Sequence, residues 1–148
     1  MLTTEQLTTE KMTGNKIIAD LRMSGLRPTR QRVALAELLF KEGDRHVTAE
    51  MLHDESVKAD IPVSLATIYN TLNQFKDAGL LREVAIDGSK TYFDTNISNH
   101  QHFYFEDTGE LCDIPGGNVE VVGISGLPEG TKISGVDVIV RLTSRQAL

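Results

Sequence analysis

The chain has 148 residues, of which 40% are hydrophobic and 24% charged, a composition typical of a globular protein that excludes wholesale disorder. It holds no run of about 18 apolar residues, and its polar N-terminal stretch lacks the apolar core of a signal peptide, so we expect a cytoplasmic protein without a membrane-spanning helix. The single cysteine, Cys112, excludes an internal disulfide and an all-cysteine zinc site within one chain.

The formal net charge of −6 is unevenly distributed along the chain. Residues 1–90 hold 12 basic and 13 acidic side chains, whereas residues 91–148 hold 3 and 8. Four arginines fall close together in the first part, at Arg22, Arg27, Arg30 and Arg32. A nucleic-acid-binding protein needs a local positive face rather than a basic total, because phosphate contacts are local. The same run is also typical of a solvated helix face, so charge alone leaves both interpretations open.

The first half of the chain predicts three helices behind a flexible N-terminal arm at residues 1–13. Helical periodicity of apolar residues starts near Lys16, and Gly25 is a typical stop signal. Pro28 and Thr29 then open a second helix, and Thr48 is placed to cap a third.

A fourth helix is the most regular segment of the sequence. It begins at Ser64, ends before Gly79, and repeats its apolar residues at spacings of 3, 4 and 3, which places them on one helical stripe. The stripe consists of Leu65, Ile68, Leu72 and Phe75. The other faces are polar but uncharged from Ser64 to Gln74, and amide and hydroxyl side chains are suited to the base edges of DNA.

A two-stranded hairpin follows this helix, with strands at residues 81–86 and 90–94 around a tight turn. Short helices followed by a hairpin are the plan of a winged-helix domain, in which the last helix before the wing enters the major groove. We therefore assign residues 14–94 to a winged-helix DNA-binding domain. An ordinary small helical bundle with a polar outer face is the alternative that the pattern alone allows.

The predicted secondary structure changes after Asp94, from mainly helical to mainly strand. Residues 102–106, 119–124 and 136–142 are β-like, and glycine- and proline-rich turns separate them. We therefore expect a second, smaller, strand-dominated α/β domain over residues 95–148, and an α+β fold for the whole chain.

The pair His100 and His102 is the main candidate for chemistry. In an extended strand, residues i and i+2 project to the same side, so both imidazoles can reach one ion, and Asp94 and Asp113 are carboxylates that can join them. Imidazole with carboxylate suits zinc, iron(II) or manganese(II), although a polar surface pair is the simpler explanation of a lone His-x-His. Nucleophile elbows and phosphate-binding glycine loops are absent from the sequence, so we expect no enzyme and keep a metal-dependent enzyme as a remote alternative.

Several motifs together resemble the ferric uptake regulator family, over about residues 14–114. The motifs that carry this resemblance are Gly25-Leu26-Arg27-Pro28-Thr29-Arg30-Gln31-Arg32, His46-Val47-Thr48-Ala49-Glu50, Ser64-Leu65-Ala66-Thr67-Ile68-Tyr69-Asn70-Thr71-Leu72, Gly88-Ser89-Lys90, Tyr92-Phe93-Asp94 and His100-x-His102. The resemblance implies a dimeric transcriptional regulator that binds an AT-rich operator, with a C-terminal dimerisation domain. It also implies a regulatory metal site, which falls on His46, Asp94, His100, His102 and Asp113.

At several positions the sequence departs from the common family pattern, and these departures are similar to those found in one branch of the family, the iron response regulators. Phe105 and Thr108 stand where many members have a zinc-binding Cys-x-x-Cys, and β-branched, glycine-broken residues 119–128 replace the usual dimer helix. Resemblance to this branch implies that haem is the effector and that haem binding releases the protein from DNA. It also implies a partner, a haem-biosynthesis enzyme that delivers the haem. The haem-ligand candidates are His46, His100 and His102. A metal-activated (manganese or iron) or peroxide-sensing repressor of the same family is the alternative.

For DNA contact we expect side chains of the fourth helix and of the arginine run. The predicted set is Arg27, Arg30, Ser64, Thr67, Tyr69 and Asn70. Core packing beside Leu72 is the alternative role for Tyr69, and a helix-surface position is the expected role of His53.

Overall fold

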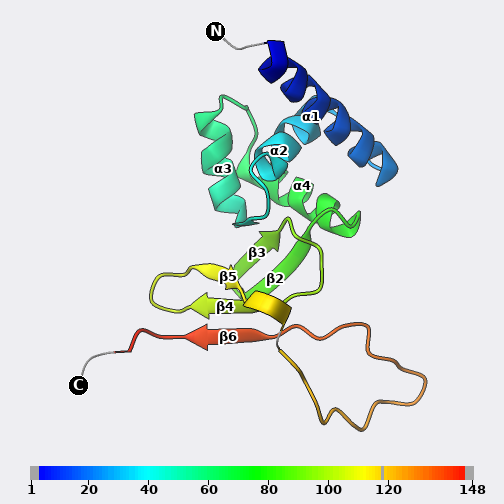
Figure 1. The fold of residues 1–148 in the computed structure, drawn as a ribbon, viewed down its shortest axis with the longest axis vertical. Coiled ribbons are helices and arrows are strands. Elements are labelled where there is room, and N and C mark those ends of the chain that lie inside the picture. Colours follow the sequence, from blue (N-terminus) through cyan, green and yellow to red (C-terminus); the bar gives the residue numbers. More distant parts are fainter. Residues whose placement is uncertain (1–3, 118, 146–148) are drawn as a thin grey trace. The chain divides into compact units, whose positions relative to one another are not determined.

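The computed structural model describes residues 4–117 and 119–145, apart from the side chains of residues 4–13 and 117. The chain divides into two compact units, Met1–Ile97 and Ser98–Leu148. Among the described residues, no helix is long and apolar enough to cross a membrane. The first unit contains, in chain order, α1 (Thr4–Met23), α2 (Arg30–Phe40), β1 (His46–Val47), α3 (Ala49–Lys58), α4 (Leu65–Asp77), β2 (Arg82–Asp87) and β3 (Lys90–Asp94) (Figure 1).

Three of the helices begin where a hydroxyl side chain caps the backbone. Thr29 accepts a hydrogen bond from the backbone N–H of Arg32 at 3.3 Å, and Ser64 accepts one from Thr67 at 3.1 Å. Thr48 does the same at the start of α3. Each bond satisfies an N–H that has no partner within its helix, and the predicted starts of α2, α3 and α4 are thereby confirmed.

Helix α1 begins earlier than the sequence indicated. Periodicity predicted a start near Lys16, whereas the helix begins at Thr4, so a helical backbone covers residues 4–13 where we expected an arm. This segment is rich in residues of good helix propensity, such as glutamate, leucine, lysine and methionine. The prediction relied on an apolar stripe, which these residues lack, and so it missed their propensity.

The core of the first unit is built on the apolar stripe of α4. Ile68, Leu72 and Phe75 are fully buried, as predicted, and Leu65 packs against them at the margin. The remaining buried members come from every other helix, from β1 and β3, and from the segment that leads into the wing; they are Ile17, Leu21, Leu35, Ala36, Leu39, Val47, Ala49, Leu52, Leu81 and Phe93. Burial of one α4 face leaves its polar face outward.

The wing is a three-stranded antiparallel sheet in the order β1-β3-β2. The hairpin of β2 and β3 was predicted, but the two-residue strand β1 was not, because it is too short to show a periodic pattern. Its pairing with β3 sets His46 opposite Asp94. Helices followed by this sheet form the expected winged-helix arrangement.

The second unit is a three-stranded sheet in the order β5-β4-β6. Strand β4 (His102–Phe105) pairs antiparallel with β5 (Leu111–Asp113) and parallel with β6 (Ile139–Leu142). A 3-10 turn, Pro115–Gly117, follows β5. The register sets His102 opposite Asp113.

The strand predicted at residues 119–124 is wrong. Residues 119–138 contain neither helix nor strand, because left-handed glycines at Gly123, Gly126 and Gly130 interrupt the extended backbone. Strand β6 accordingly starts at Ile139 rather than near Val136.

Gly79 offers a test of how α4 ends. Its φ is +82°, its N–H donates to the Lys76 carbonyl, and the Leu80 N–H donates to Phe75, which is a Schellman cap. No atom lies within 4 Å of an added Cβ, so Gly79→Ala should cost only backbone strain, about 1–2 kcal/mol of unfolding free energy. Chemical denaturation measures it.

Gly88→Ala is the matched control, since Gly88 has equal space but no positive φ. An equal loss of stability in both variants would contradict the assignment of the effect to the cap.

Candidate functional site

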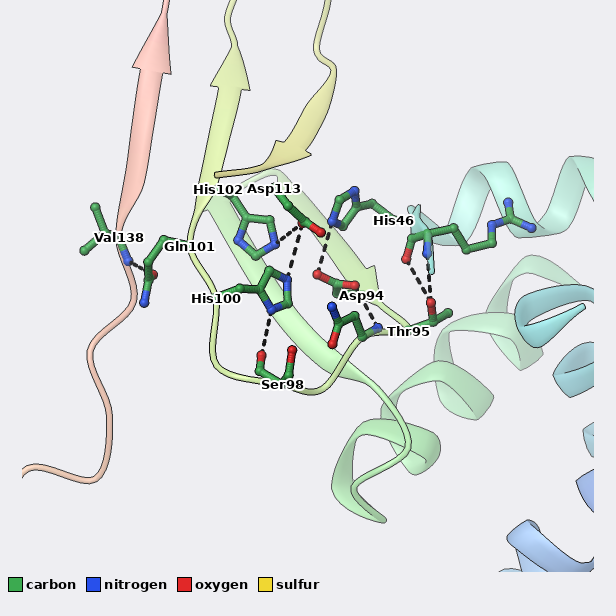
Figure 2. Close-up of polar contacts among 11 residues, drawn as sticks. His46, Asp94, Thr95, Ser98, His100, Gln101, His102, Asp113 and Val138 are labelled. Carbon is green, nitrogen blue, oxygen red and sulfur yellow. Dashed lines mark hydrogen bonds and ion pairs between the residues drawn. The ribbon is translucent and has the colours of Figure 1, made fainter. Parts of the chain in front are cut away.

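In the first unit, His46 and Asp94 form a facing pair across the wing (Figure 2). The His46 Nε2 atom lies 3.1 Å from Asp94 Oδ2, and the two side chains are 15% and 1% exposed. Asp94 also accepts a hydrogen bond from the backbone N–H of Asn96 at 2.9 Å. The β1–β3 register produces this pair, because opposite residues of an antiparallel ladder project to the same face.

Arg45 fixes the strand that carries His46. Its backbone N–H donates to Thr95 Oγ1 at 2.9 Å, and its carbonyl accepts from the Thr95 N–H at 3.0 Å. Its guanidinium donates to both carboxylate oxygens of Glu55 on α3, at 2.6 and 2.8 Å, and to the Leu38 carbonyl at 3.2 Å. The hydrogen bond to Glu55 raises the pKa of Arg45 above its ordinary value. Strand β1 is therefore tied to α2, to α3 and to the end of β3.

In the second unit, His100, His102 and Asp113 converge (Figure 2). Both histidine Nε2 atoms lie 3.4 Å from Asp113 Oδ1, and each of the three residues offers a ligand atom within 4.8 Å of the others. His102 is 1% exposed, His100 10% and Asp113 40%. The sequence prediction placed these three side chains as possible ligands, and the structure brings them together.

Three contacts with the backbone orient the segment that carries the histidine pair. The Nδ1 atom of His100 lies 2.6 Å from the Ser98 carbonyl, which can only accept, so Nδ1 donates this hydrogen bond. Gln101, between the histidines, accepts from the Val138 N–H at 2.6 Å and donates to the Val136 carbonyl at 3.1 Å. Gln101 thus points toward the chain before β6 while the two imidazoles turn to Asp113.

This donor set fits a divalent transition metal. Two imidazole nitrogens and one carboxylate are ligands that iron(II), zinc and manganese(II) accept. A ligating histidine ordinarily donates its other ring N–H to a carbonyl or carboxylate, and His100 does so through Ser98. The His46–Asp94 pair offers the same two donor types in the first unit.

The residues predicted for DNA contact lie on α2, on α4 and just before them. Arg27, Arg30, Ser64 and Asn70 are exposed, and Thr67 is half-buried at the start of α4. Tyr69 is 40% exposed, so its alternative role in the core is wrong. Its hydroxyl donates to Glu50 on α3 at 2.5 Å. His53 is half-buried on α3 and lies outside both His/Asp groups.

Sequence reasoning missed four residues around these groups. Arg45 and Glu55 support His46, and Glu50 accepts a hydrogen bond from Tyr69. An acidic residue on a helix surface, such as Glu50 or Glu55, gives no sequence signal of its tertiary partner. Ser98 acts through its backbone carbonyl, which every residue type has. A single sequence therefore contains no mark of these roles.

The chain thus consists of a winged-helix unit followed by a β-rich unit, and each unit contains a group of His and Asp side chains. These features are the basis on which the chain is compared with known protein families. The model of the ferric uptake regulator family matches residues 23–140, and the chain belongs to that family. The family is one of regulators, which places the chain outside the enzymes.

Comparisons with individual proteins agree with this assignment. The chain is 39% identical over 97 residues to the peroxide-responsive repressor PerR of Staphylococcus aureus strain Mu50, covering 65% of this chain and 64% of that protein's length. The solved ferric uptake regulator of Pseudomonas aeruginosa with manganese gives a TM-score of 0.66 at 24% identity, over 88% of this chain and 98% of that one. That of Vibrio cholerae gives 0.67 at 21%, over 86% and 98%. These similarities confirm the α+β fold.

The Arg45–Glu55 contact predicts a local stability effect. Glu55→Ala leaves a partly buried guanidinium without its two strongest acceptors, and we expect a loss of about 1.5–3 kcal/mol, the contribution of hydrogen bonds to a charged group. Urea denaturation measures the loss. Asp54→Ala, an exposed acid on the same helix, should stay within about 0.5 kcal/mol of the wild type; equal effects in the two variants would contradict the supporting role.

Proposed function

We propose that this protein is a sequence-specific DNA-binding transcriptional regulator whose affinity for its operator depends on a bound divalent metal ion. The proposed ligands are His46, Asp94, His100, His102 and Asp113. The observation that carries the proposal is the presence of preorganised His/carboxylate donors in both units.

Chain connectivity supports one shared ion. Only residues 95–99 separate Asp94 from His100, and six residue steps span at most about 20 Å. The connection is therefore short enough to allow both donor groups to ligate one ion. An ion that ligates both favours one arrangement of the winged helix, and it shifts the population of that arrangement by its differential affinity.

A second copy of the chain is the proposed partner. Two winged helices on one face of DNA must match half-sites about 34–36 Å apart, so an ion that fixes the winged helix also sets operator affinity. Residues 119–138 expose apolar side chains at 37–76% of their surface, an excess that suits burial in an interface. They are Val121, Val122, Ile124, Leu127, Ile133 and Val136.

Direct DNA contacts are proposed for the surface around α4. Tyr69, Asn70 and Thr67 are assigned to bases, and Ser64, Arg27 and Arg30 to phosphates or the minor groove. Support comes from the exposure of these polar side chains, apart from the half-buried Thr67, on and beside a helix whose apolar face packs in the core. An α-helix with such a face fits the major groove.

A metal ion suits these histidines better than haem does. All three haem-ligand candidates face a carboxylate: His46 faces Asp94, and His100 and His102 face Asp113. That combination matches the preference of divalent ions. The 39% identity to PerR favours the metal-activated or peroxide-sensing alternative over the iron response regulator branch and its haem effector.

The proposed signal is therefore divalent metal and, with iron, peroxide. Iron(II), when bound, supplies a reductant for hydrogen peroxide next to the ligand imidazoles. The buried His102 side chain and the carbonyl-bound His100 are held in place by the chain. Modification of either imidazole would remove a donor nitrogen from the site.

Metal dependence is tested by fluorescence anisotropy of a labelled duplex, obtained by selection on the protein from a randomised pool. In chelator we expect affinity to fall at least ~10-fold relative to manganese(II), equivalent to about 1.4 kcal/mol. The His100→Ala/His102→Ala variant should bind in manganese(II) as weakly as wild type does in chelator, and His53→Ala should behave as wild type. Undiminished binding in chelator would refute the proposal, and release of the manganese form by stoichiometric haem would restore the haem hypothesis.

Peroxide sensing is tested on the same duplex with protein loaded anaerobically with iron(II) or manganese(II). Hydrogen peroxide should release DNA only from the iron form, and peptide mass spectrometry should find one added oxygen atom on His46, His100 or His102. Equal release from both forms, or oxygen found only on Cys112 or methionine, would exclude sensing at this site.

A further inference from the structure

A contact between two helices of the first unit joins an acidic side chain to the surface proposed for DNA. Glu50 lies in the first turn of α3, and Tyr69 lies in the second turn of α4. The Tyr69 hydroxyl donates to Glu50 Oε1 at 2.5 Å. Both side chains are exposed, at 40% in the case of Tyr69, so burial does not force them together.

The contact affects the protonation of both groups. The hydrogen bond from Tyr69, with a smaller contribution from the Glu50 backbone N–H, holds the pKa of the Glu50 carboxyl below its ordinary value. The carboxylate raises the pKa of the Tyr69 phenol above its ordinary value. Near neutral pH the pair is therefore a carboxylate and a neutral phenol whose only proton is engaged.

Two consequences follow for a nucleic acid at this surface. With its proton engaged, the Tyr69 oxygen offers only lone pairs, so among base edges it matches an exocyclic amine, on adenine N6 or cytosine N4. The Glu50 carboxylate also places a negative charge beside a helix whose own residues are uncharged from Ser64 to Gln74, and such a charge repels phosphate.

We propose that Glu50 is a positioning and specificity-determining residue, which fixes the Tyr69 ring and hydroxyl for base recognition and disfavours sequence-independent binding to the DNA backbone. The inference rests on the proposed DNA-binding function. Its distinctive claim is that a carboxylate lowers general DNA affinity while raising discrimination between sequences, in line with specificity built from unfavourable contacts to wrong partners.

Variants that separate charge from hydrogen bonding test this role. Glu50→Gln removes the charge and keeps the side-chain shape, Tyr69→Phe removes only the hydroxyl, and Asp54→Asn is the control that makes the same charge change elsewhere on α3. Anisotropy with the selected duplex and a scrambled duplex of equal composition, in manganese(II), gives the specificity ratio. Spectrophotometric titration of tyrosinate needs no DNA and is uncomplicated by tryptophan, which the chain lacks.

For Glu50→Gln we expect tighter binding to the scrambled duplex and a specificity ratio lower by ~10-fold, in the range of one lost base contact. Tyr69→Phe should lower the ratio similarly, and the double variant should lower it no further. One tyrosine, absent in Tyr69→Phe, should ionise at lower pH in Glu50→Gln. Asp54→Asn should leave the specificity ratio and the tyrosinate titration at wild-type values.

The outcomes distinguish the inference from the function on which it rests. If wild type prefers no duplex over its scrambled form, the proposed function fails. If wild type discriminates but Glu50→Gln keeps the full ratio, only the role of Glu50 is overturned. An unchanged tyrosinate titration in Glu50→Gln overturns the contact itself, and equal losses in Asp54→Asn assign the effect to net charge alone and overturn the role.

Discussion

The pairing of β1 with β3 is the constraint on which the first donor pair depends. It sets His46 opposite Asp94, and the backbone of Arg45 bonds to Thr95 in both directions. A strand of two residues has little stability of its own, so its position relies on the Arg45–Glu55 contact with α3. The packing of the winged-helix unit thus holds the candidate ligand His46 in place.

In the second unit, a different pair of strands brings the candidate donor side chains together. His100 and His102 share one side of the chain, and the β4–β5 register brings Asp113 to them. The Ser98 carbonyl accepts a hydrogen bond from Nδ1 of His100, a contact of the kind that orients metal-ligating imidazoles. Preorganised donors lower the entropy lost on binding, so affinity depends mainly on the match of donor type to metal.

Helix α3 connects the proposed metal and DNA surfaces within the winged-helix unit. Glu55 holds Arg45 beside His46, and Glu50, on the same helix, holds the hydroxyl of Tyr69 on α4. An α-helix is stiff over such a length, so a displacement at one end moves both contacts together. The unit therefore contains a physical connection from a candidate ligand to a candidate base-reading side chain.

The sequence by itself determined the capped starts of α2, α3 and α4, the wing hairpin and the candidate pair His100 and His102, because caps, apolar spacing and His-x-His spacing are local signals. His46 became a candidate ligand only through the resemblance to the family. The apolar pattern misplaced the start of α1, because residues 4–13 have helix propensity but no apolar stripe. It also predicted a strand at residues 119–124, where left-handed glycines interrupt the extended backbone. Tertiary structure alone decided the strand β1, the exposure of Tyr69 and the partners of Glu50 and Glu55. Those features depend on residues distant in the chain, and the residue types involved are common on any helix surface.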